Sequence, residues 1–417
     1  MTWRARSLGE VLRIEHGYAF KGEHFADSGK YVVLTPGNFH EQGGFRPRPG
    51  KDRFYSGPFP DRYLLKKDDI IVAMTEQGEG LLGSAAIIPD DDTYLHNQRL
   101  GLVREQNAVA DRRFLYYLFN SDYVRQQIRN SSSGAKVRHT SPERMYAVKI
   151  HFPDSVAVQR KVAAILSAYD DLIANNQRRI ALLESMAEEI YREWFVRMRF
   201  PCYEDATFSK GRPKAWKEGR LGDIADFTMG QSPSSEFYNE RGDGLPFHQG
   251  VGTYGPRFPR HVVYCSVPGR SAKAGDILFS VRAPVGRMNI ADRDLTIGRG
   301  LAAMRHREGA NAYLFYLLHT CFATEDLIGN GSIFNSVGKD ELARFPIIKP
   351  DDALVEKFDC LTKPIGEELG LLYETVDALQ GVRDRLLPRL ISGKLKVDHL
   401  DIRMPPSMRE VVGSASA

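Results

Sequence analysis

The sequence has few of the features that mark a secreted, metal-binding or membrane protein. Its four cysteines, Cys202, Cys265, Cys321 and Cys360, lie far apart and form no CxxC pair, which argues against a zinc site and against a disulfide framework. No run of eighteen apolar residues occurs, so no segment is predicted to span a membrane. The first residues lack the apolar core of a signal peptide. We therefore expect a cytoplasmic protein with reduced thiols.

The common signatures of catalysis are also absent. The Gly-rich stretch 75–83 follows an apolar segment, but it contains neither GxGxxG nor the lysine of a phosphate-binding loop. The [DN]PP[FY] tetrapeptide of an adenine methyltransferase does not occur in a suitable context. Asp351 and Asp352 with Glu356 and Lys357 have the letters of a nuclease site, but they open a predicted helix, where acids favour the N-terminal dipole. The sequence predicts no catalytic centre and no metal site.

Two long amphipathic segments are present. From Val158 to Met198, apolar residues recur every three or four positions in a seam that includes Leu172, with Asn176 in one apolar slot. The pattern recurs from Val355 to Leu395, with Leu361 in the seam, at an offset of 355 − 158 = 197 residues. A helix of this length spans about 60 Å at 1.5 Å per residue. We predict that the two helices pair; the alternative is that each lies on one domain.

Shorter motifs repeat in the same order in the two halves of the chain. Leu8–Val11 matches Leu221–Ile224, at an offset of 221 − 8 = 213, and Phe114–Leu118 matches Tyr313–Leu317, at an offset of 313 − 114 = 199. The offset drifts downward along the chain, as small differences in loop length would cause, while the order never breaks. The sequence therefore predicts an internal duplication.

The duplication predicts an α+β fold class, with two homologous mixed domains joined by two long antiparallel helices. The helices would form a coiled-coil-like rod with an internal pseudo-two-fold axis. They are predicted to be antiparallel because the connection after the first one is too short to carry the chain back along the rod. The predicted boundaries are 1–153 for the first domain, 154–198 for the first helix, 199–215 for a linker, 216–350 for the second domain, 351–395 for the second helix and 396–417 for a C-terminal tail that we expect to be disordered.

Basic and aromatic residues interleave in the middle loop of each domain. The net charge is only +4, so the distribution of charge is more informative than its total. Cations and rings in one loop suit a phosphate backbone and base edges, although a solvated charged loop is the alternative. The cations are Arg46, Arg48, Lys51, Arg53 and Arg62 in the first domain and Arg257, Arg260, Arg270 and Lys273 in the second. The domains share a framework and differ in their loops, as two modules that read different sequences would.

Several motifs stand at fixed places around the repeat. They are Glu193-Trp194-Phe195-Val196-Arg197 before Phe200-Pro201, Trp216 before Leu221-Gly222-Asp223, Ala274-Gly275-Asp276-Ile277-Leu278, and Leu386-Leu387-Pro388-Arg389-Leu390-Ile391-Ser392-Gly393-Lys394-Leu395. With these motifs the chain resembles the specificity subunit of type I restriction–modification enzymes, through to about Leu395. It departs from the family at Val158-Gln159 and Val355-Glu356, which only partly follow the usual Pro-Pro-x-x-Glu-Gln lead into each helix.

The resemblance implies a non-catalytic subunit whose two target-recognition domains read the halves of a split, asymmetric DNA site, with the helices as a ruler for the unread gap. The implied partners are double-stranded DNA, two methyltransferase (modification) subunits and a restriction/translocase subunit. S-adenosylmethionine, ATP and Mg²⁺ are expected on the partner subunits, and no cofactor is expected on this chain. The alternatives are a specificity-like DNA-reading subunit of another phage-defence complex and a two-armed protein adaptor without DNA binding.

The residues predicted to contact DNA are cations and glutamines in the loops, because Arg and Gln suit bidentate contacts to guanine and adenine. For the first half-site they are Arg46, Arg48, Arg53, Gln77, Lys136 and Arg138. For the second they are Gln249, Arg257, Arg260, Arg270, Arg282 and Arg287. Three helix positions predicted to be exposed, Arg178, Glu184 and Arg383, are candidates for binding the partner subunit.

Overall fold

A computed structural model describes residues 3–76, 80–106, 109–134, 136–267, 269–322 and 336–409. The chain divides into two compact units. Unit 1 contains residues 1–177 and 374–417, and unit 2 contains residues 178–373. Each unit therefore holds one copy of the repeated domain together with one segment of each long helix.

Unit 1 contains a β-rich domain with three short helices. Its strands are β1 (Trp3–Ser7), β2 (Leu12–His16), β3 (Phe25–Ala26), β4 (Tyr31–Val33), β5 (Phe54–Tyr55), β6 (Ile70–Ala73), β7 (Thr75–Glu76), β8 (Ala85–Ile87), β9 (Tyr94–Leu95), β10 (Leu100–Glu105), β11 (Arg138–His139) and β12 (Lys149–Pro153). Its helices are α1 (Arg112–Phe119), α2 (Asp122–Asn130) and α3 (Pro142–Tyr146). The sheets have the orders β2-β10-β6-β8 and β3-β5-β4-β9, with the pairs β1-β12 and β7-β11.

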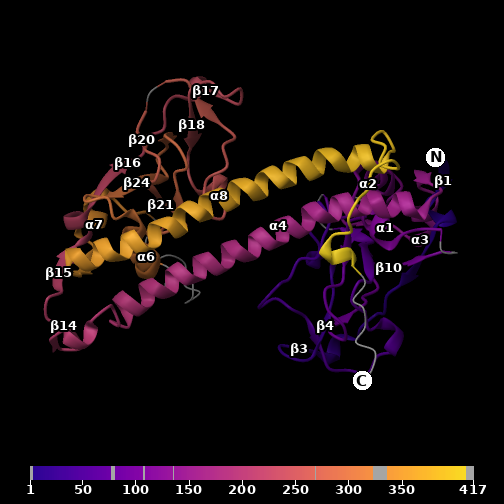
Figure 1. Ribbon diagram of the computed structural model, residues 1–417, viewed down its shortest axis with the longest axis horizontal. Helices are drawn as coiled ribbons and strands as arrows, with labels where there is room; N and C mark the ends of the chain where they lie inside the picture. Colours follow the sequence, from indigo (N-terminus) through magenta and orange to yellow (C-terminus); the bar gives the residue numbers. More distant parts are fainter. Residues whose placement is uncertain are drawn as a thin grey trace. The chain divides into compact units, whose positions relative to one another are not determined.

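The domain of unit 2 repeats this architecture (Figure 1). Its strands are β13 (Phe208–Ser209), β14 (Arg212–Pro213), β15 (Lys217–Arg220), β16 (Ala225–Met229), β17 (Tyr238–Asn239), β18 (Leu245–His248), β19 (Tyr264–Cys265), β20 (Ser271–Ala272), β21 (Ile277–Ser280), β22 (Met288–Ile290), β23 (Leu295–Ile297), β24 (Leu301–His306) and β25 (Pro346–Lys349). Its helices are α5 (Leu221–Ile224), α6 (Asn311–Phe322) and α7 (Lys339–Arg344). The sheets have the orders β16-β24-β21-β22 and β17-β19-β18-β23-β20, with the pairs β15-β25 and β13-β14.

The strand orders confirm the duplication that the sequence predicted. Sheet β2-β10-β6-β8 corresponds strand by strand to β16-β24-β21-β22, and the parallel pair β4-β9 recurs as β18-β23. Within the predicted linker 199–215, strands β13 and β14 pair as a short hairpin. The boundaries of the domains themselves stay predictions.

Strand β6 shows why the central strands are mostly apolar. Ile70 and Val72 belong to the core that also contains Phe114 of α1, whereas Ile71 and Ala73 belong to a second core on the opposite face of the sheet. Because successive side chains of a strand point to opposite faces, a strand buried on both faces is mostly apolar. In unit 2, β21 is likewise buried at all four of its positions, and its single polar residue, Ser280, is hydrogen-bonded.

Two long helices, α4 (Val156–Tyr191) and α8 (Asp352–Ile391), each contribute a segment to both units. In unit 1 the two segments run antiparallel. Val158, near the start of α4, shares a core with Leu390 near the end of α8, whereas Asp170, farther along α4, bonds the earlier Arg383. Polar and apolar contacts therefore join the two segments of this unit.

The α4 and α8 segments of unit 2 also run antiparallel. The ring of Tyr191, at the end of α4, lies 5.8 Å from the ring of Phe358 near the start of α8. Arg179, earlier in α4, bonds Glu368, later in α8, at 2.5 Å between Nη2 and Oε1. The predicted antiparallel pairing of the helices is thus confirmed within each unit.

The seam between the helices differs from the predicted one by single residues. Leu172 is 51% exposed and its neighbour Ile173 only 6%, while Leu361 is 48% exposed and Thr362 only 2%. An α-helix of 3.6 residues per turn drifts against a strict 3.5-residue repeat, so the buried face moves to the adjacent position. The helices also begin 352 − 156 = 196 residues apart, one fewer than the predicted offset.

The ends of the long helices differ from prediction as well. The first helix was predicted over 154–198, but α4 ends at Tyr191 and a π-helical turn, Arg192–Val196, follows it. The second was predicted over 351–395, and α8 ends at Ile391. Gly393, with a φ of +72°, follows this last turn, and such a left-handed residue typically terminates a helix.

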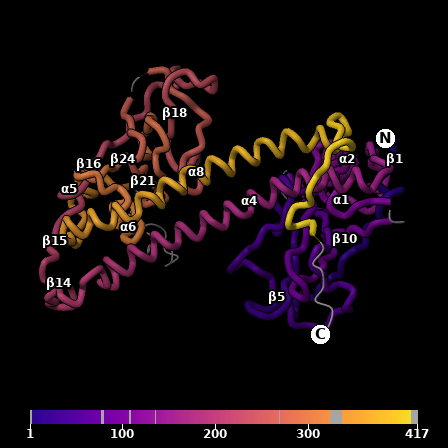
Figure 2. The backbone as a smooth tube through the Cα atoms, viewed as in Figure 1, coloured from indigo at the N-terminus to yellow at the C-terminus, as the bar shows by residue number. Residues whose placement is uncertain are grey.

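The disordered tail predicted over 396–417 is wrong for residues 396–409. Lys161 of α4 donates through Nζ to the backbone carbonyls of Asp398 and Leu400, at 2.8 and 2.6 Å. This segment follows α8 and lies on unit 1 (Figure 2). The prediction rested on Pro405, Pro406 and the small residues at the end of the chain, which resemble an unpaired tail. Residues 410–417 lie outside the described residues.

Candidate nucleic-acid interface

The basic loop of the first domain starts from a tight turn. The backbone N–H of Thr35 donates to the side-chain oxygen of Asn38 at 2.9 Å, and the N–H of Arg46 donates to the Asn38 carbonyl at 2.8 Å. The side chain of Arg46 is exposed. The half-buried Arg48 lies against Gly37, where an added Cβ would be 2.5 Å from its Nη1, so this contact depends on glycine.

Between residues 30 and 62 of the same domain, three cations lie over aromatic rings. The pairs are Arg53 over Phe25 at 4.2 Å, Lys30 over Tyr31 at 4.9 Å and Arg62 over Tyr63 at 4.9 Å, each measured from the charged centre to the ring centroid. The Arg53 side chain remains exposed. Such pairs hold a cation at a defined place on the surface while leaving it able to meet phosphate. The prediction omitted Lys30, although Lys30 and Tyr31 are adjacent in sequence.

The remaining candidates of the first domain lie along the β7-β11 pair. Arg138 pairs with Glu76 across the two strands, and the side chains of Lys136 and Arg138 are exposed. Gln77 lies outside the described residues. The buried carboxylate of Glu76 accepts the backbone N–H groups of residues 80–82 at 3.2, 3.0 and 2.9 Å. Glu76 thus holds the loop beside these cations, a role that its position in the sequence did not indicate.

In the second domain the predicted DNA-contacting residues divide into exposed cations and tied side chains. The exposed cations are Arg260, Arg270, Arg282 and Arg287. The side chain of Gln249 is exposed, but its Oε1 accepts the hydroxyl hydrogen of Ser232 at 2.8 Å. Gln249 can therefore offer a base its amide N–H groups, whereas its oxygen already has a partner.

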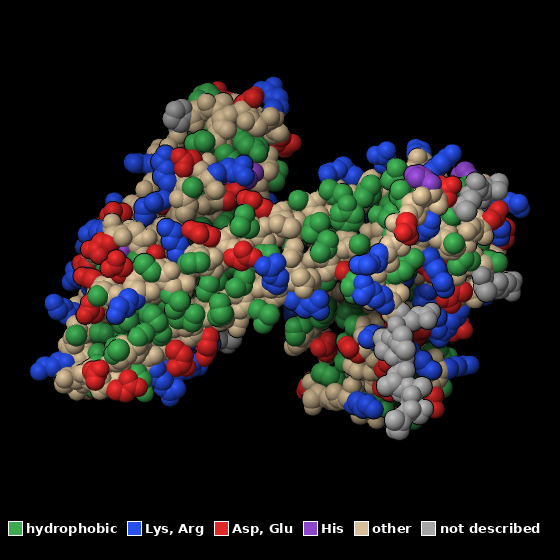
Figure 3. Space-filling view, in the orientation of Figure 1, with side chains coloured by type: hydrophobic (Ala, Val, Ile, Leu, Met, Phe, Trp, Pro, Cys, Tyr) green, Lys and Arg blue, Asp and Glu red, His purple; other side chains and the backbone are tan. Residues whose placement is uncertain are grey.

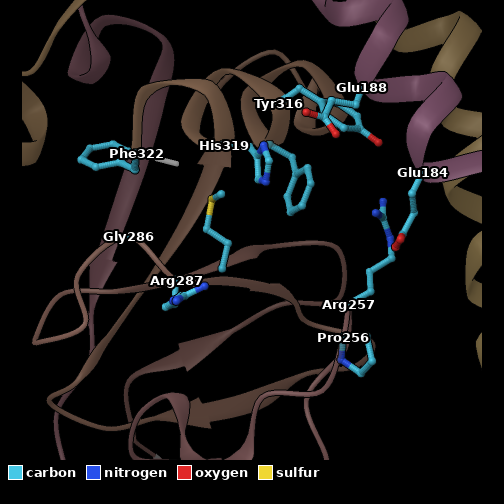
Figure 4. Close-up of a pocket in the computed structure, with 11 residues that line it drawn as sticks. Glu184, Glu188, Pro256, Arg257, Gly286, Arg287, Tyr316, His319 and Phe322 are labelled. Carbon is cyan, nitrogen blue, oxygen red and sulfur yellow. The ribbon is translucent and has the colours of Figure 1, made fainter. Parts of the chain in front are cut away.

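Arg257 and Arg287 line a pocket of about 450 Å³ within unit 2 (Figure 4). Other walls of the pocket carry Glu184 of α4 and Phe315 of α6. The guanidinium of Arg257 lies 5.2 Å from the centroid of the Phe315 ring. Arg257 is half-buried and contacts its own chain, so the structure does not place it with the exposed cations.

A chain of hydrogen bonds fixes the base of the loop that carries Gln249 and Arg257. His248 Nδ1 is 2.7 Å from Thr253 Oγ1, His248 Nε2 is 3.0 Å from His261 Nδ1, and His261 Nε2 is 3.0 Å from both oxygens of Asp292. The Asp292 carboxylate accepts from His261. With both rings neutral, His248 then donates to His261 and Thr253 donates to His248.

Electrostatics support this arrangement. Burial, with a smaller contribution from the neighbouring His261, lowers the pKa of His248 to about 4, so the His248 ring is neutral at pH 7. In the first domain, burial and then the neighbouring Arg46 lower the pKa of His40. Nothing in the sequence indicated the hydrogen-bond network of the second domain, because its members come from separate loops.

Two of the three helix positions predicted to bind a partner are not exposed. Arg178 is exposed, as predicted. The half-buried Glu184 accepts the Tyr373 hydroxyl hydrogen at 3.0 Å, and the half-buried Arg383 donates to Asp170 at 2.8 Å. Both predictions of exposure are wrong, because in antiparallel helices long polar side chains at the edge of the seam reach across to the other helix.

In the described part of the chain, no group of three or more His, Cys, Asp and Glu side chains could hold a metal ion. None of the helices there combines the length and the apolar character needed to cross a lipid bilayer. All four cysteines are free. The side chains of the candidate interface thus offer hydrogen bonds and charge.

Comparisons with known proteins agree on one family. The family model for the type I restriction modification DNA specificity domain matches residues 1–185 and 213–357. The putative type I restriction enzyme MjaX specificity subunit of Methanocaldococcus jannaschii is 28% identical over 352 residues, which cover 81% of this chain and 80% of that protein. The MjaIX specificity subunit of the same organism is 25% identical over 317 residues, 72% of each chain. The S subunit structure from M. genitalium has a TM-score of 0.63 at 15% identity, covering 94% of this chain and 96% of that one, which shows a similar fold.

Proposed function

The chain belongs to the family of type I restriction–modification DNA specificity subunits, and from this membership we propose that it reads a bipartite, asymmetric DNA site, one half-site with each repeated domain. A specificity subunit of this kind is non-catalytic. The proposal assigns sequence reading to this chain and the chemistry on DNA to its partners.

One observation carries the proposal: the same framework is built twice with different loop side chains. The strand orders of the two domains correspond, but the loop after β6 is held by the carboxylate of Glu76, whereas the loop after β21 is held by the hydroxyl of Ser280, which accepts the N–H of Arg287 at 2.8 Å. Different side chains on one scaffold are what two domains need to distinguish two half-sites.

The exposed cations are proposed to make the contacts with DNA. In the first domain these are Arg46, Arg53, Lys136 and Arg138, and in the second Arg260, Arg270 and Arg282, whereas Arg287 lines the pocket with Glu184 and Glu188 and is expected to contribute less. Arginine can bond guanine O6 and N7 together, and any of these residues can neutralise a phosphate. Gln77 stays a predicted contact, while Arg48 is half-buried and Gln249 has a partner within the chain, so both are expected to contribute less.

The long helices are proposed to carry two modification subunits, which bring S-adenosylmethionine and methylate an adenine at N6 in each half-site. A flipped adenine is accessible to such a subunit, whereas a stacked one is not. In unit 2, Leu182 is 70% exposed on α4 and Met186 lies one turn farther along the helix. Figure 3 shows hydrophobic side chains along this part of α4, where an apolar partner surface would be buried. A restriction/translocase subunit, with ATP and Mg²⁺, would join the same complex.

Methylation sequencing tests this function directly. The chain would be co-expressed with the modification subunit of its own system, and the host DNA sequenced for N6-methyladenine. We expect a split motif methylated on both strands, and no such motif when the modification subunit is expressed alone. An intact complex without new methylation would contradict the proposal, and would favour a DNA-reading subunit of another defence complex or a protein adaptor.

The ruler role of the helices has a separate test. Inserting four residues, about one helical turn, between Ile180 and Ala187 should lengthen the unread gap and leave both half-sites unchanged. The gap would be determined by the same methylation sequencing. A variant with altered half-site bases and an unchanged gap would show that the helices do not set the spacing.

A further inference from the structure

A tight turn, Gly255–Phe258, projects from the basic loop of unit 2. It is closed by the N–H of Gly255, which donates to the carbonyl of Phe258 at 3.0 Å. Strand β22 holds it from the side, since Asn289 Nδ2 donates to the Gly255 carbonyl at 3.0 Å and the N–H of Ile290 donates to the Arg257 carbonyl at 2.8 Å. The backbone of the turn is therefore fixed to the sheet of its own domain.

The two side chains at the end of this turn reach beyond the sheet. Phe258 packs edge-on against Tyr373 of α8, with ring centroids 5.8 Å apart and an interplanar angle of 82°. Gly370, about one turn earlier in α8, also lies beside the ring, since a Cβ added there would be in ordinary van der Waals contact with Phe258 at 4.0 Å. Arg257 lies over Phe315 of α6. One turn thus contacts a short helix and a long helix.

The second long helix meets the same place. The hydroxyl of Tyr373 donates to Glu184 of α4 at 3.0 Å, and Glu184 lines the pocket into which Arg257 extends (Figure 4). Tyr316 of α6, the helix that packs against the sheet, lines the same pocket as Arg257. Through these contacts, all within unit 2, the turn joins the recognition domain to both long helices.

This environment does not suit a contact with DNA at Arg257. The carboxylates of Glu184 and Glu188 line the same pocket and would repel a phosphate. The Nε of Arg257 is buried, and the guanidinium is already engaged by Phe315. A base edge could reach this guanidinium only if the contacts that hold it were broken.

We propose that Arg257 and Phe258 form a latch that fixes the second recognition domain on the helix pair of unit 2 and thereby positions its DNA-reading loops. The latch rests on the proposed function, and it makes Arg257 and Phe258 positioning residues. In unit 1 the corresponding turn, His40–Gly44, is closed by the N–H of His40 bonding to the Gly44 carbonyl at 3.1 Å. Its last two residues are glycines, so the latch side chains belong to the second domain alone.

The test compares three variants in the complex with the modification subunit, once sequencing of the wild type has defined the split site. Phe258→Ala removes the ring that contacts Tyr373, Phe258→Tyr keeps it, and Arg260→Ala removes a nearby exposed charge. Methylation is measured on plasmids with the native gap and with gaps one base pair shorter and longer. The dependence of DNA binding on salt is measured for each complex.

With the latch removed, the second domain is no longer held at one orientation. Phe258→Ala should therefore reduce the preference for the native gap at least ten-fold, with the salt dependence unchanged because no charge is lost. Phe258→Tyr should behave as wild type. Arg260→Ala should keep the gap preference and lower the slope of log affinity against log salt by about 1.

A Phe258→Ala complex that melts as the wild type does and keeps the native gap preference would overturn the latch. If Phe258→Ala fails to fold, Arg257→Gln, which replaces the guanidinium over Phe315 with a neutral amide, is measured in the same way and decides the matter. A wild-type complex that methylates no split site would instead contradict the proposed function, so the two failures are distinguishable.

Discussion

Tyr117 of unit 1 and Tyr316 of unit 2 take the same position in the repeated helix, 316 − 117 = 199 residues apart, yet their side chains have different neighbours. Tyr117 donates to Asp170 of α4 at 2.6 Å, and Asp170 in turn accepts from Arg383 of α8. Tyr316 instead lines a pocket of unit 2 together with Arg257, which comes from a loop of its own domain. One position thus ties domain 1 to the helices directly, whereas in domain 2 it lies beside a loop of the domain.

The difference shows which parts of a duplicated fold are constrained. A buried hydroxyl needs one hydrogen-bond partner, and neither the type of that partner nor the element that supplies it is prescribed. The sheet cores admit mostly apolar residues of fitting size, so β6 and β21 remain alike. Polar contacts between a domain and the long helices can therefore differ between the two units. In unit 2 they accompany the contacts of the latch.

The largest difference in stability between variants of the two units is expected at a buried position of the long helices. Phe358 in unit 2 and Val162 in unit 1 are fully buried and lie 358 − 162 = 196 residues apart, the helix offset. Phe358→Ala should lower the free energy of unfolding by about 3–5 kcal/mol, and Val162→Ala by about 2 kcal/mol. Denaturant titration followed by the fluorescence of Trp194 and Trp216, both in unit 2, measures the first change. If both variants lost the same free energy of unfolding, the two units would not differ at this position.

The ion pair behind Tyr117 is expected to matter next. Arg383→Ala leaves the largely buried carboxylate of Asp170 without its cation, which should cost about 2–3 kcal/mol, less than for a fully buried pair because both side chains are partly exposed. The double variant Asp170→Ala with Arg383→Ala is the control, and it should lose less than the single variant. Thermal unfolding monitored by circular dichroism checks both. A double variant less stable than the single one would contradict the argument.

Each domain also contains a buried histidine whose pKa is lowered to about 4, His96 in unit 1 and His248 in unit 2, chiefly by burial. Unfolded histidine has a pKa near 6.5, so between pH 6.5 and 4 the unfolded chain binds protons that the folded chain does not. The free energy of unfolding should therefore fall as the pH decreases through this window, by about 2 kcal/mol per histidine at pH 5.

Denaturation measured at pH 7 and pH 5 tests this, with His248→Gln and His96→Gln as variants that keep hydrogen-bonding groups without titrating. Each variant should lose about half of the pH dependence that the two residues cause. If only one variant reduces the dependence of the free energy of unfolding on pH, the two domains differ in their sensitivity to acid. If neither does, the lowered pKa values are not the cause.

The smallest effect is expected at Tyr373. Tyr373→Phe removes the hydroxyl that donates to Glu184 and keeps the ring that contacts Phe258, so stability should fall by about 1 kcal/mol. The gap preference of methylation should stay that of the wild type, because the ring of the latch is intact. A change in gap preference as large as that expected of Phe258→Ala would mean that the hydroxyl, and not the ring, positions the domain.

Much of the framework was predictable because it depends on local pattern. The ordered repeat predicted the duplication, and the three-to-four spacing of apolar residues predicted both α4 and α8. The separation of α1 from α2 was not predictable in the same way. Asn120 stands between them and bonds Ala85 through both its amide oxygen and its amide nitrogen, at 2.9 and 3.2 Å. A contact across 35 positions of sequence has no local signature.

The candidate interface was predictable only in part. Arg46, Arg53 and Arg260 are exposed cations, in agreement with the predicted role, whereas Arg257 has the same residue type and lies in the same loop as Arg260 but faces into its own chain. Arg383 was predicted to be exposed and bonds Asp170 instead. Residue type gives the charge of a side chain, but the direction in which it points depends on neighbours that are distant in sequence.

The amino-acid sequence by itself determined the duplication, the two long helices, the mixed character of the domains and the family, because each of these follows from residue order and periodicity. Only the tertiary structure decided which leucines face the seam, where residues 396–409 lie, and which arginines bind their own chain. These depend on the partners that a side chain finds in space, and packing selects one position out of several that the pattern allows. Leu172 and Ile173 are equally apolar, but only Ile173 is buried.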